Sequence, residues 1–292
     1  MKPLRLSLAL LVLSGCLIVP SAAKAADISE TARATAVQAQ KAVVTIRLVV
    51  KIKMSMMGQS QDHEQKVEAT GTVIDPAGLT VADASTVDPT SMMKSMFGGA
   101  YKVDSEIKET LILLEDGTEV EADVVLNDTD LGLAFIRPRD AARKFDAVTL
   151  KPRPTPPQLL DNIFVVGRLG KNGNRAAALS LDTIQALVKG PRPFYVADKT
   201  SHPGCVVYSA DGEPLGVQVM KQRPRAVGDD GGGMGLGMMT RMGDMRDAII
   251  PIIRPVNDVI EIAAQAKEAK VPAKKEASTP EKKDAPGEAP PK

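Results

Sequence analysis

The chain has 292 residues, enough for one large or two small domains, and its hydrophobic (43%) and charged (25%) fractions are those of a globular protein. Only two histidines are present, which leaves little material for histidine-rich metal sites or for acid–base chemistry near neutral pH. The formal net charge of +1 gives no general reason to expect a nucleic acid as partner, and no cofactor is expected.

The first 25 residues have the pattern of a secretory signal peptide. Lys2 and Arg5 precede an apolar run over residues 6–19, and Ala23 and Ala25 supply the small residues that a signal peptidase requires. We therefore expect export, to the periplasm or the extracellular space. Three basic residues and no acidic one lie in this segment, so the 37 basic and 36 acidic residues of the whole chain become 34 and 36. No basic field remains to attract nucleic acid.

A second interpretation of the same segment involves Cys16. Leu13-Ser14-Gly15-Cys16 fits the lipobox of bacterial lipoproteins, whereas the apolar run continues past the cysteine to Val19. Soluble export and lipidation at Cys16 both stay open, and a membrane partner is expected only with the lipid. Cys205 is the other cysteine of the chain, so we expect no disulfide framework.

Short strands dominate the pattern of the middle of the chain. Runs of β-branched or alternating apolar residues predict strands at 43–50, 71–74, 110–114, 120–126, 131–136, 162–166, 194–196 and 215–220. Helical periodicity is confined to 28–41 and 256–267. Four prolines between Pro152 and Pro157 form a stiff connector that divides the β region in two. The pattern predicts a mostly β protein of the sandwich or barrel kind.

The end of the chain differs in composition. Residues 266–292 are almost entirely Lys, Glu, Ala and Pro, too polar to bury an apolar face. We therefore predict a disordered tail.

Methionines gather in two parts of the chain. The first half contains Met54, Met56, Met57, Met92, Met93 and Met96, and the glycine-rich segment 231–245 contains Met234, Met238, Met239, Met242 and Met245. Thioether clusters bind Cu(I), flexible methionine surfaces accept apolar peptides, and methionine also fills irregular loops. We expect no metal site, and the weak candidates for Cu(I) are Met234, Met238, Met239 and Met242.

Several motifs follow one another in the order and spacing of a known family. Residues 71–87 contain a glycine turn followed by Leu-Thr-Val-Ala-Asp-Ala-Ser-Thr-Val, and residues 114–134 end in Asp-Leu-Gly-Leu-Ala. Residues 161–167 form a short apolar run, and residues 201–217 read Ser-His-Pro-Gly-Cys-Val-Val-Tyr before a glycine hairpin. With the strand and helix at 248–265, these segments resemble trypsin-like serine protease domains of the HtrA type.

The resemblance implies a mostly β fold, a trypsin-like double β-barrel with a C-terminal helix. It predicts a helical lead-in at 27–42 after the signal peptide at 1–25. The barrel domain is expected at 43–265, with barrel one at about 43–151 and barrel two at about 158–265, and the tail is expected at 266–292.

The same resemblance places the catalytic triad of the family at Ser85, Asp130 and Pro203, of which only Asp130 matches the family residue. Serine cannot take a proton as histidine does, and proline offers neither a nucleophilic oxygen nor the backbone N–H that the family uses in its oxyanion hole. The intact triad is therefore absent, and loss of catalysis is predicted. We expect Asp130 to be held by local hydrogen bonds, with Ser85 as a candidate donor.

Three functions stay open. The first is a degenerate protease homologue, a pseudoenzyme that binds peptides or envelope proteins in the cleft between the barrels, at a sheet edge or through the methionine-rich loops. The second is an active serine-type endopeptidase with a rearranged triad, for which Ser201 and Cys205 are candidate nucleophiles and His202 and His63 candidate bases. The third is a Cu(I)-binding protein. We expect both histidines at the surface, His63 in a loop, and Cys205 as a small buried apolar residue.

Overall fold

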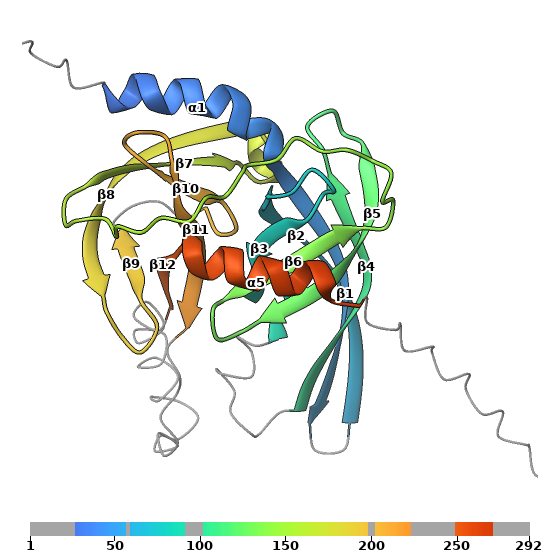
Figure 1. The fold of residues 1–292 in the computed structure, drawn as a ribbon. Coiled ribbons are helices and arrows are strands. Elements are labelled where there is room, and N and C mark those ends of the chain that lie inside the picture. Colours follow the sequence, from blue (N-terminus) through green and yellow to red (C-terminus); the bar gives the residue numbers. More distant parts are fainter. Residues whose placement is uncertain (1–26, 57–58, 91–101, 198–201, 223–248, 271–292) are drawn as a thin grey trace, which may run out of the picture.

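The computed structural model describes residues 27–56, 59–90, 102–197, 202–222 and 249–270 (Figure 1). Its strands form two closed antiparallel barrels that lie side by side (Figure 1). Barrel one has the strand order β1-β2-β3-β6-β5-β4, and barrel two has the order β10-β11-β12-β9-β8-β7. The predicted fold class is confirmed.

Barrel one consists of β1 (Val43–Met56), β2 (Gln59–Val73), β3 (Thr80–Asp83), β4 (Lys102–Leu113), β5 (Glu119–Asp128) and β6 (Leu133–Pro138). Barrel two consists of β7 (Asn162–Arg168), β8 (Ala177–Val188), β9 (Phe194–Ala197), β10 (Val206–Ser209), β11 (Pro214–Gln222) and β12 (Ile249–Pro255). The described helices are α1 (Ile28–Ala42), α2 (Ala84–Val87) and α5 (Val256–Glu268), with a 3₁₀ turn η2 (Lys171–Gly173). None of the helices in these ranges is long and apolar enough to cross a membrane.

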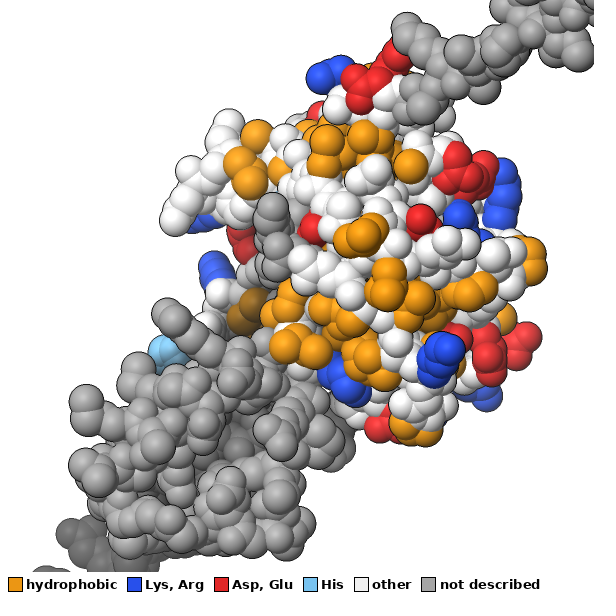
Figure 2. All heavy atoms as spheres, turned by 90° about the vertical axis from the view of Figure 1, so that its left-hand side faces the viewer, with side chains coloured by type: hydrophobic (Ala, Val, Ile, Leu, Met, Phe, Trp, Pro, Cys, Tyr) orange, Lys and Arg blue, Asp and Glu red, His pale blue; other side chains and the backbone are white. Residues whose placement is uncertain are grey.

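Every predicted strand coincides with part of an observed one, and the proline connector runs from β6 to β7. The polar half of β2 was missed, and the prediction of a loop at His63 is wrong because this residue pairs with Ile52 of β1. β8 was also missed. Its Leu179 and Leu181 are exposed while Asp182 is buried, which reverses the usual alternation of an apolar inner face and a polar outer face. Figure 2 shows the face of barrel two on which hydrophobic side chains gather.

Two helices frame the barrels. α1 lies against β7 and β8, and α5 contacts β11 and β12 of barrel two as well as β6 of barrel one (Figure 1). α5 continues to Glu268 and buries Ala266, so the first residues of the predicted tail belong to this helix. The rest of the predicted tail, 271–292, and the predicted signal peptide lie outside the described residues.

Arginines fix both helices by donating to carbonyls at the helix C-terminal ends, which lack partners within the helix. The guanidinium of Arg168 donates to the carbonyls of Gln40 and Val43 at 3.1 Å each, at the end of α1. Arg137 donates to the carbonyls of Ala266, Lys267 and Ala269 at the end of α5.

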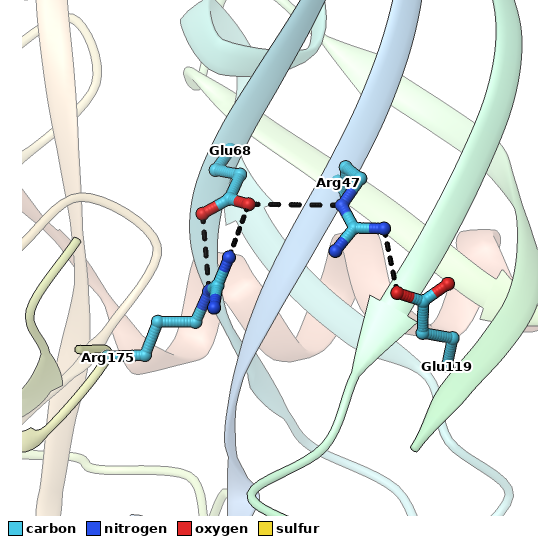
Figure 3. A network of polar contacts seen from close by, with 4 residues as sticks. All are labelled: Arg47, Glu68, Glu119 and Arg175. Carbon is cyan, nitrogen blue, oxygen red and sulfur yellow. Dashed lines mark hydrogen bonds and ion pairs between the residues drawn. The ribbon is translucent and has the colours of Figure 1, made fainter. Parts of the chain in front are cut away.

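An ion-pair network connects the barrels on the side where β2 faces the turn between β7 and β8 (Figure 3). Arg175 of that turn lies 2.6 Å from Glu68 of β2, and Arg47 of β1 lies 3.8 Å from Glu68 and 2.7 Å from Glu119. A groove of about 730 Å³ opens beside this network. The Arg175–Glu68 pair therefore joins barrel two to barrel one on this side, whereas the pairs made by Arg47 lie within barrel one.

Candidate functional site

The candidate site is a cleft at the junction of the two barrels. A pocket of about 120 Å³ lies there between α2 and the β5–β6 turn of barrel one and the strands β11 and β12 of barrel two. Its lining includes Ser85 and Asp130, two of the three positions that the family resemblance assigns to the triad.

The buried carboxylate of Asp83 lies at the edge of this cleft, at the end of β3. Asp83 is only 1% exposed. Its Oδ2 accepts the hydroxyl of Ser85, and its Oδ1 accepts the backbone N–H of Met220 in β11 at 2.9 Å. Burial raises the pKa of Asp83 above its usual value, and these hydrogen bonds partly oppose that change. One carboxylate thus connects barrel one to barrel two and occupies the hydroxyl of Ser85.

Asp130 lies at the solvent-exposed rim of the pocket. Its side chain is 81% exposed and lies 3.9 Å from the guanidinium of Arg192. The expected hydrogen bond from Ser85 to Asp130 is wrong, because Ser85 donates to Asp83. The motif spacing correctly predicted that Asp130 lies in the β5–β6 turn beside the cleft, but its side chain faces solvent.

The third position, Pro203, lies in a turn of barrel two that packs against barrel one. Its neighbour Gly204 has φ +85°, and a Cβ there would lie 2.2 Å from the carbonyl oxygen of Thr70. Thr72 donates its hydroxyl to the carbonyl of Gly204 at 3.1 Å and accepts the N–H of Val206 at 3.3 Å. Glycine is therefore required at position 204, and Pro203 is held at the barrel junction.

Cys205 follows this turn and is fully buried, as expected. Burial raises the pKa of its thiol to about 12. A thiol that stays protonated at neutral pH and has no exposed surface is a poor nucleophile, which argues against Cys205 as a substitute catalytic group.

Neither histidine lines the pocket. His63 is exposed on β2. His202 is half-buried against Gly167, and burial lowers its pKa. Its Nε2 lies 3.2 Å from the hydroxyl of Ser180 on β8. Sequence reasoning identified His202 but missed Ser180, because 22 positions separate the two residues in the chain.

The cleft also contains Arg254 of β12, which was not predicted as a site residue. It is 2% exposed, and its Nε and Nη2 donate to the carbonyls of Leu131 and Asp130 at 2.7 and 3.1 Å. Its guanidinium carbon lies 5.9 Å from the ring centre of Phe194. The signal in the sequence was an arginine at an inward position of an apolar strand, Ile-Ile-Pro-Ile-Ile-Arg-Pro.

One edge of β11 faces the cleft. β10 pairs with β11 only as far as Val217, whereas β12 pairs with it as far as Gln222. On the side away from β12, Gln218 exchanges hydrogen bonds with the turn at 204–205, and Met220 donates to Asp83. Since N–H groups alternate between the two edges of a strand, the backbone of Gln222 faces the same side. No described strand covers this edge beyond Gln218.

Other predicted candidates lie outside the described residues: Cys16, Ser201 and the methionines at 57, 92, 93, 96, 234, 238, 239, 242 and 245. The predictions about lipidation, a nucleophile at Ser201 and Cu(I) therefore stay predictions. Met54 lies on β1 and packs against the core.

Comparisons with known proteins agree with this architecture. A family model described as trypsin-like peptidase domain matches residues 69–217. Among solved structures, a variant of the HtrA-type protease AlgW with a tripeptide is similar with a TM-score of 0.50 and 14% identity. The match covers 80% of this chain and 62% of that protease, so the chain spans less than two thirds of its length. No curated protein sequence matches. The structural likeness shows the fold.

Proposed function

Since the chain belongs to the trypsin-like peptidase domain family, we propose that it is an exported, non-catalytic member that binds extended peptide or protein segments of the cell envelope. The cleft between the barrels is the binding site. The observation that carries the proposal is that a pocket lies between the barrels and is lined, at the position of the family's base, by Ser85, whose hydroxyl donates to Asp83.

The chemistry of the cleft supports the loss of hydrolysis. A triad needs a base that takes the proton of the nucleophile and returns it to the leaving group. At the position of that base, Ser85 is hydrogen-bonded to Asp83, and neither histidine of the chain lines the pocket. Pro203 supplies no nucleophile and no oxyanion N–H. Each departure alone would slow hydrolysis by orders of magnitude.

The edge of β11 supports the binding of an extended segment. Beyond Gln218 no described strand pairs with this edge; the N–H of Met220 is taken by Asp83, which leaves the carbonyl of Met220 and the backbone of Gln222 for a peptide. A peptide in an extended conformation can form main-chain hydrogen bonds with such an edge. The pocket lies beside the same strand, so side chains of the peptide at alternate positions can enter it.

Binding to this edge is tested with fluorescein-labelled β-casein, an unfolded protein, by fluorescence anisotropy. Gln222→Pro removes a backbone N–H on the cleft side of β11 and leaves the hydrogen bonds to β12 in place. We expect it to weaken binding about tenfold, which corresponds to the loss of one hydrogen bond, and Gln222→Ala to have no effect. Equal affinities for the protein and Gln222→Pro, or no binding by either, would overturn the proposal.

A second candidate function, hydrolysis by a rearranged pair, has one observation in its favour. The hydroxyl of Ser180 and Nε2 of His202 lie within hydrogen-bond distance, and the lowered pKa of His202 keeps its ring neutral at pH 7. A fluorophosphonate probe tests this candidate. Labelling that disappears in Ser180→Ala supports it, and an unlabelled protein removes it.

A further inference from the structure

The pocket in the cleft is lined by the buried guanidinium of Arg254, which has no part in the proposed main-chain hydrogen bonds between β11 and a peptide. The Nε and Nη2 groups of Arg254 donate to carbonyls, but its Nη1 is buried and has no hydrogen-bond partner among the described residues. A buried donor on a charged group without a partner is costly. The guanidinium of Arg254 therefore lacks one acceptor among the described residues, and a negatively charged ligand in the pocket that Arg254 lines would compensate its charge.

The charges around Arg254 leave this guanidinium without a bonded carboxylate in the described part of the chain. Asp130 lines the same pocket, but its exposed side chain is directed to Arg192. Asp128 and Asp258 interact with Arg254 only through space. A second cation, Lys221, also lines the pocket, so two cations and one solvent-exposed carboxylate surround the space.

The size of the pocket limits what can enter. A water molecule takes about 30 Å³ of liquid volume, so about 120 Å³ holds a few waters or one small polar group. The remaining walls include Val219 and Ile252, against which a methylene group packs. A carboxylate on a short aliphatic stem fits both the volume and the lining.

We propose that this pocket is a carboxylate-binding subsite, in which Arg254 and Lys221 receive a carboxylate of the bound segment. The inference rests on the proposed function, because the segment lying along β11 brings the carboxylate to the pocket. The carboxylate comes from an acidic side chain or from the C-terminus of the segment. We therefore expect the preferred ligands to carry a carboxylate at one fixed position along the bound segment, and we expect their affinity to decrease with added salt.

The test uses labelled decapeptides of alternating Ala and Val, in which one Glu is moved through the positions and compared with Gln at the same position. A further pair carries a free C-terminal carboxylate or a C-terminal amide without any Glu. We expect one position, or the free C-terminus, to bind about tenfold more tightly than its neutral counterpart, as for one charge-assisted hydrogen bond. The position of the preference identifies which source supplies the carboxylate.

Variants connect the preference to the pocket. We expect Lys221→Gln and Arg254→Gln to reduce the ratio of the two affinities to near one, with Lys151→Gln as the matched control because Lys151 is exposed beside Glu213, outside the pocket lining. Lys221 makes no described hydrogen bond between the barrels, so Lys221→Gln keeps the test valid if Arg254→Gln does not fold. If neutral peptides bind but Glu and free carboxylates give no preference, the subsite is wrong and the proposed function stands. If no peptide binds, the proposed function fails and the subsite with it.

Discussion

Replacement of Asp83 by asparagine tests the connection between the barrels at the cleft. The carboxylate of Asp83 accepts the N–H of Met220 across the junction and the hydroxyl of Ser85 within barrel one. Asparagine keeps an oxygen that accepts the N–H of Met220, and its NH₂ group can donate to the hydroxyl of Ser85, so both contacts persist but lose the charge of the carboxylate. Hydrogen bonds to a charged group contribute about 1.5–3 kcal/mol each and neutral ones about 1 kcal/mol, while asparagine removes the cost of burying the charge, so we expect Asp83→Asn to lower the free energy of unfolding by about 1 kcal/mol at pH 7.

Urea denaturation followed by circular dichroism measures this change. Asp146→Asn serves as the matched control, because Asp146 is exposed and the substitution is expected to alter stability by less than about 0.5 kcal/mol. Equal stabilities for Asp83→Asn and Asp146→Asn would refute the argument that the Asp83 carboxylate joins the barrels.

The pH dependence of the same pair gives an independent check. Burial raises the pKa of Asp83 in the folded protein, so the folded state binds this proton more tightly than the unfolded chain. The resulting stabilisation is present below the ordinary aspartate pKa of 3.8 and is lost as the pH rises through the folded-state pKa. We expect the stability of the protein relative to Asp83→Asn to increase as the pH is lowered towards 3.8. A difference that shrinks on acidification would contradict a raised pKa.

Three further predictions concern the turn at 203–205 and the arginine at the end of α1. Gly204→Ala forces a Cβ against Thr70 at a positive φ, and we expect a loss of about 3 kcal/mol or more in urea denaturation; a loss below 1 kcal/mol would contradict the packing. The thiol of Cys205 should not react with Ellman's reagent at pH 8 until the protein is unfolded, because it is buried with a pKa of about 12; rapid reaction of the folded protein would contradict its burial. Arg168→Met removes the donors to the end of α1 and should lower stability by about 2 kcal/mol and speed hydrogen exchange in α1. Unchanged exchange would show that other contacts hold the helix.

The barrels could be predicted because the motifs that define them are local. The runs around the glycine turn at 78 and before Pro214 combine β-branched residues with turn residues in a fixed order, and this order is visible in one sequence. β8 and the polar half of β2 escaped prediction because their inner and outer faces do not follow the usual alternation of apolar and polar residues.

The chemistry at the cleft was less predictable than the fold. The spacing of the motif placed Asp130 in the β5–β6 turn. It could not show whether the side chain faces Ser85 or solvent, because the direction of a side chain in a turn depends on the backbone conformation of the turn. Asp83 lies only two positions from Ser85, yet its importance comes from Met220, 137 positions further along the chain. The unpartnered Nη1 of Arg254 is likewise a property of the packed barrels, because the sequence does not show which carbonyls surround it.

The most direct test of the central claim is the hydrolysis of β-casein by the purified protein, followed by mass spectrometry of the products. We expect no fragments beyond those in buffer alone, for the protein and for its Asp130→Ala and Ser180→Ala variants alike. Fragments that accumulate with the protein and disappear in either variant would contradict a non-catalytic cleft and would identify the group that performs the hydrolysis.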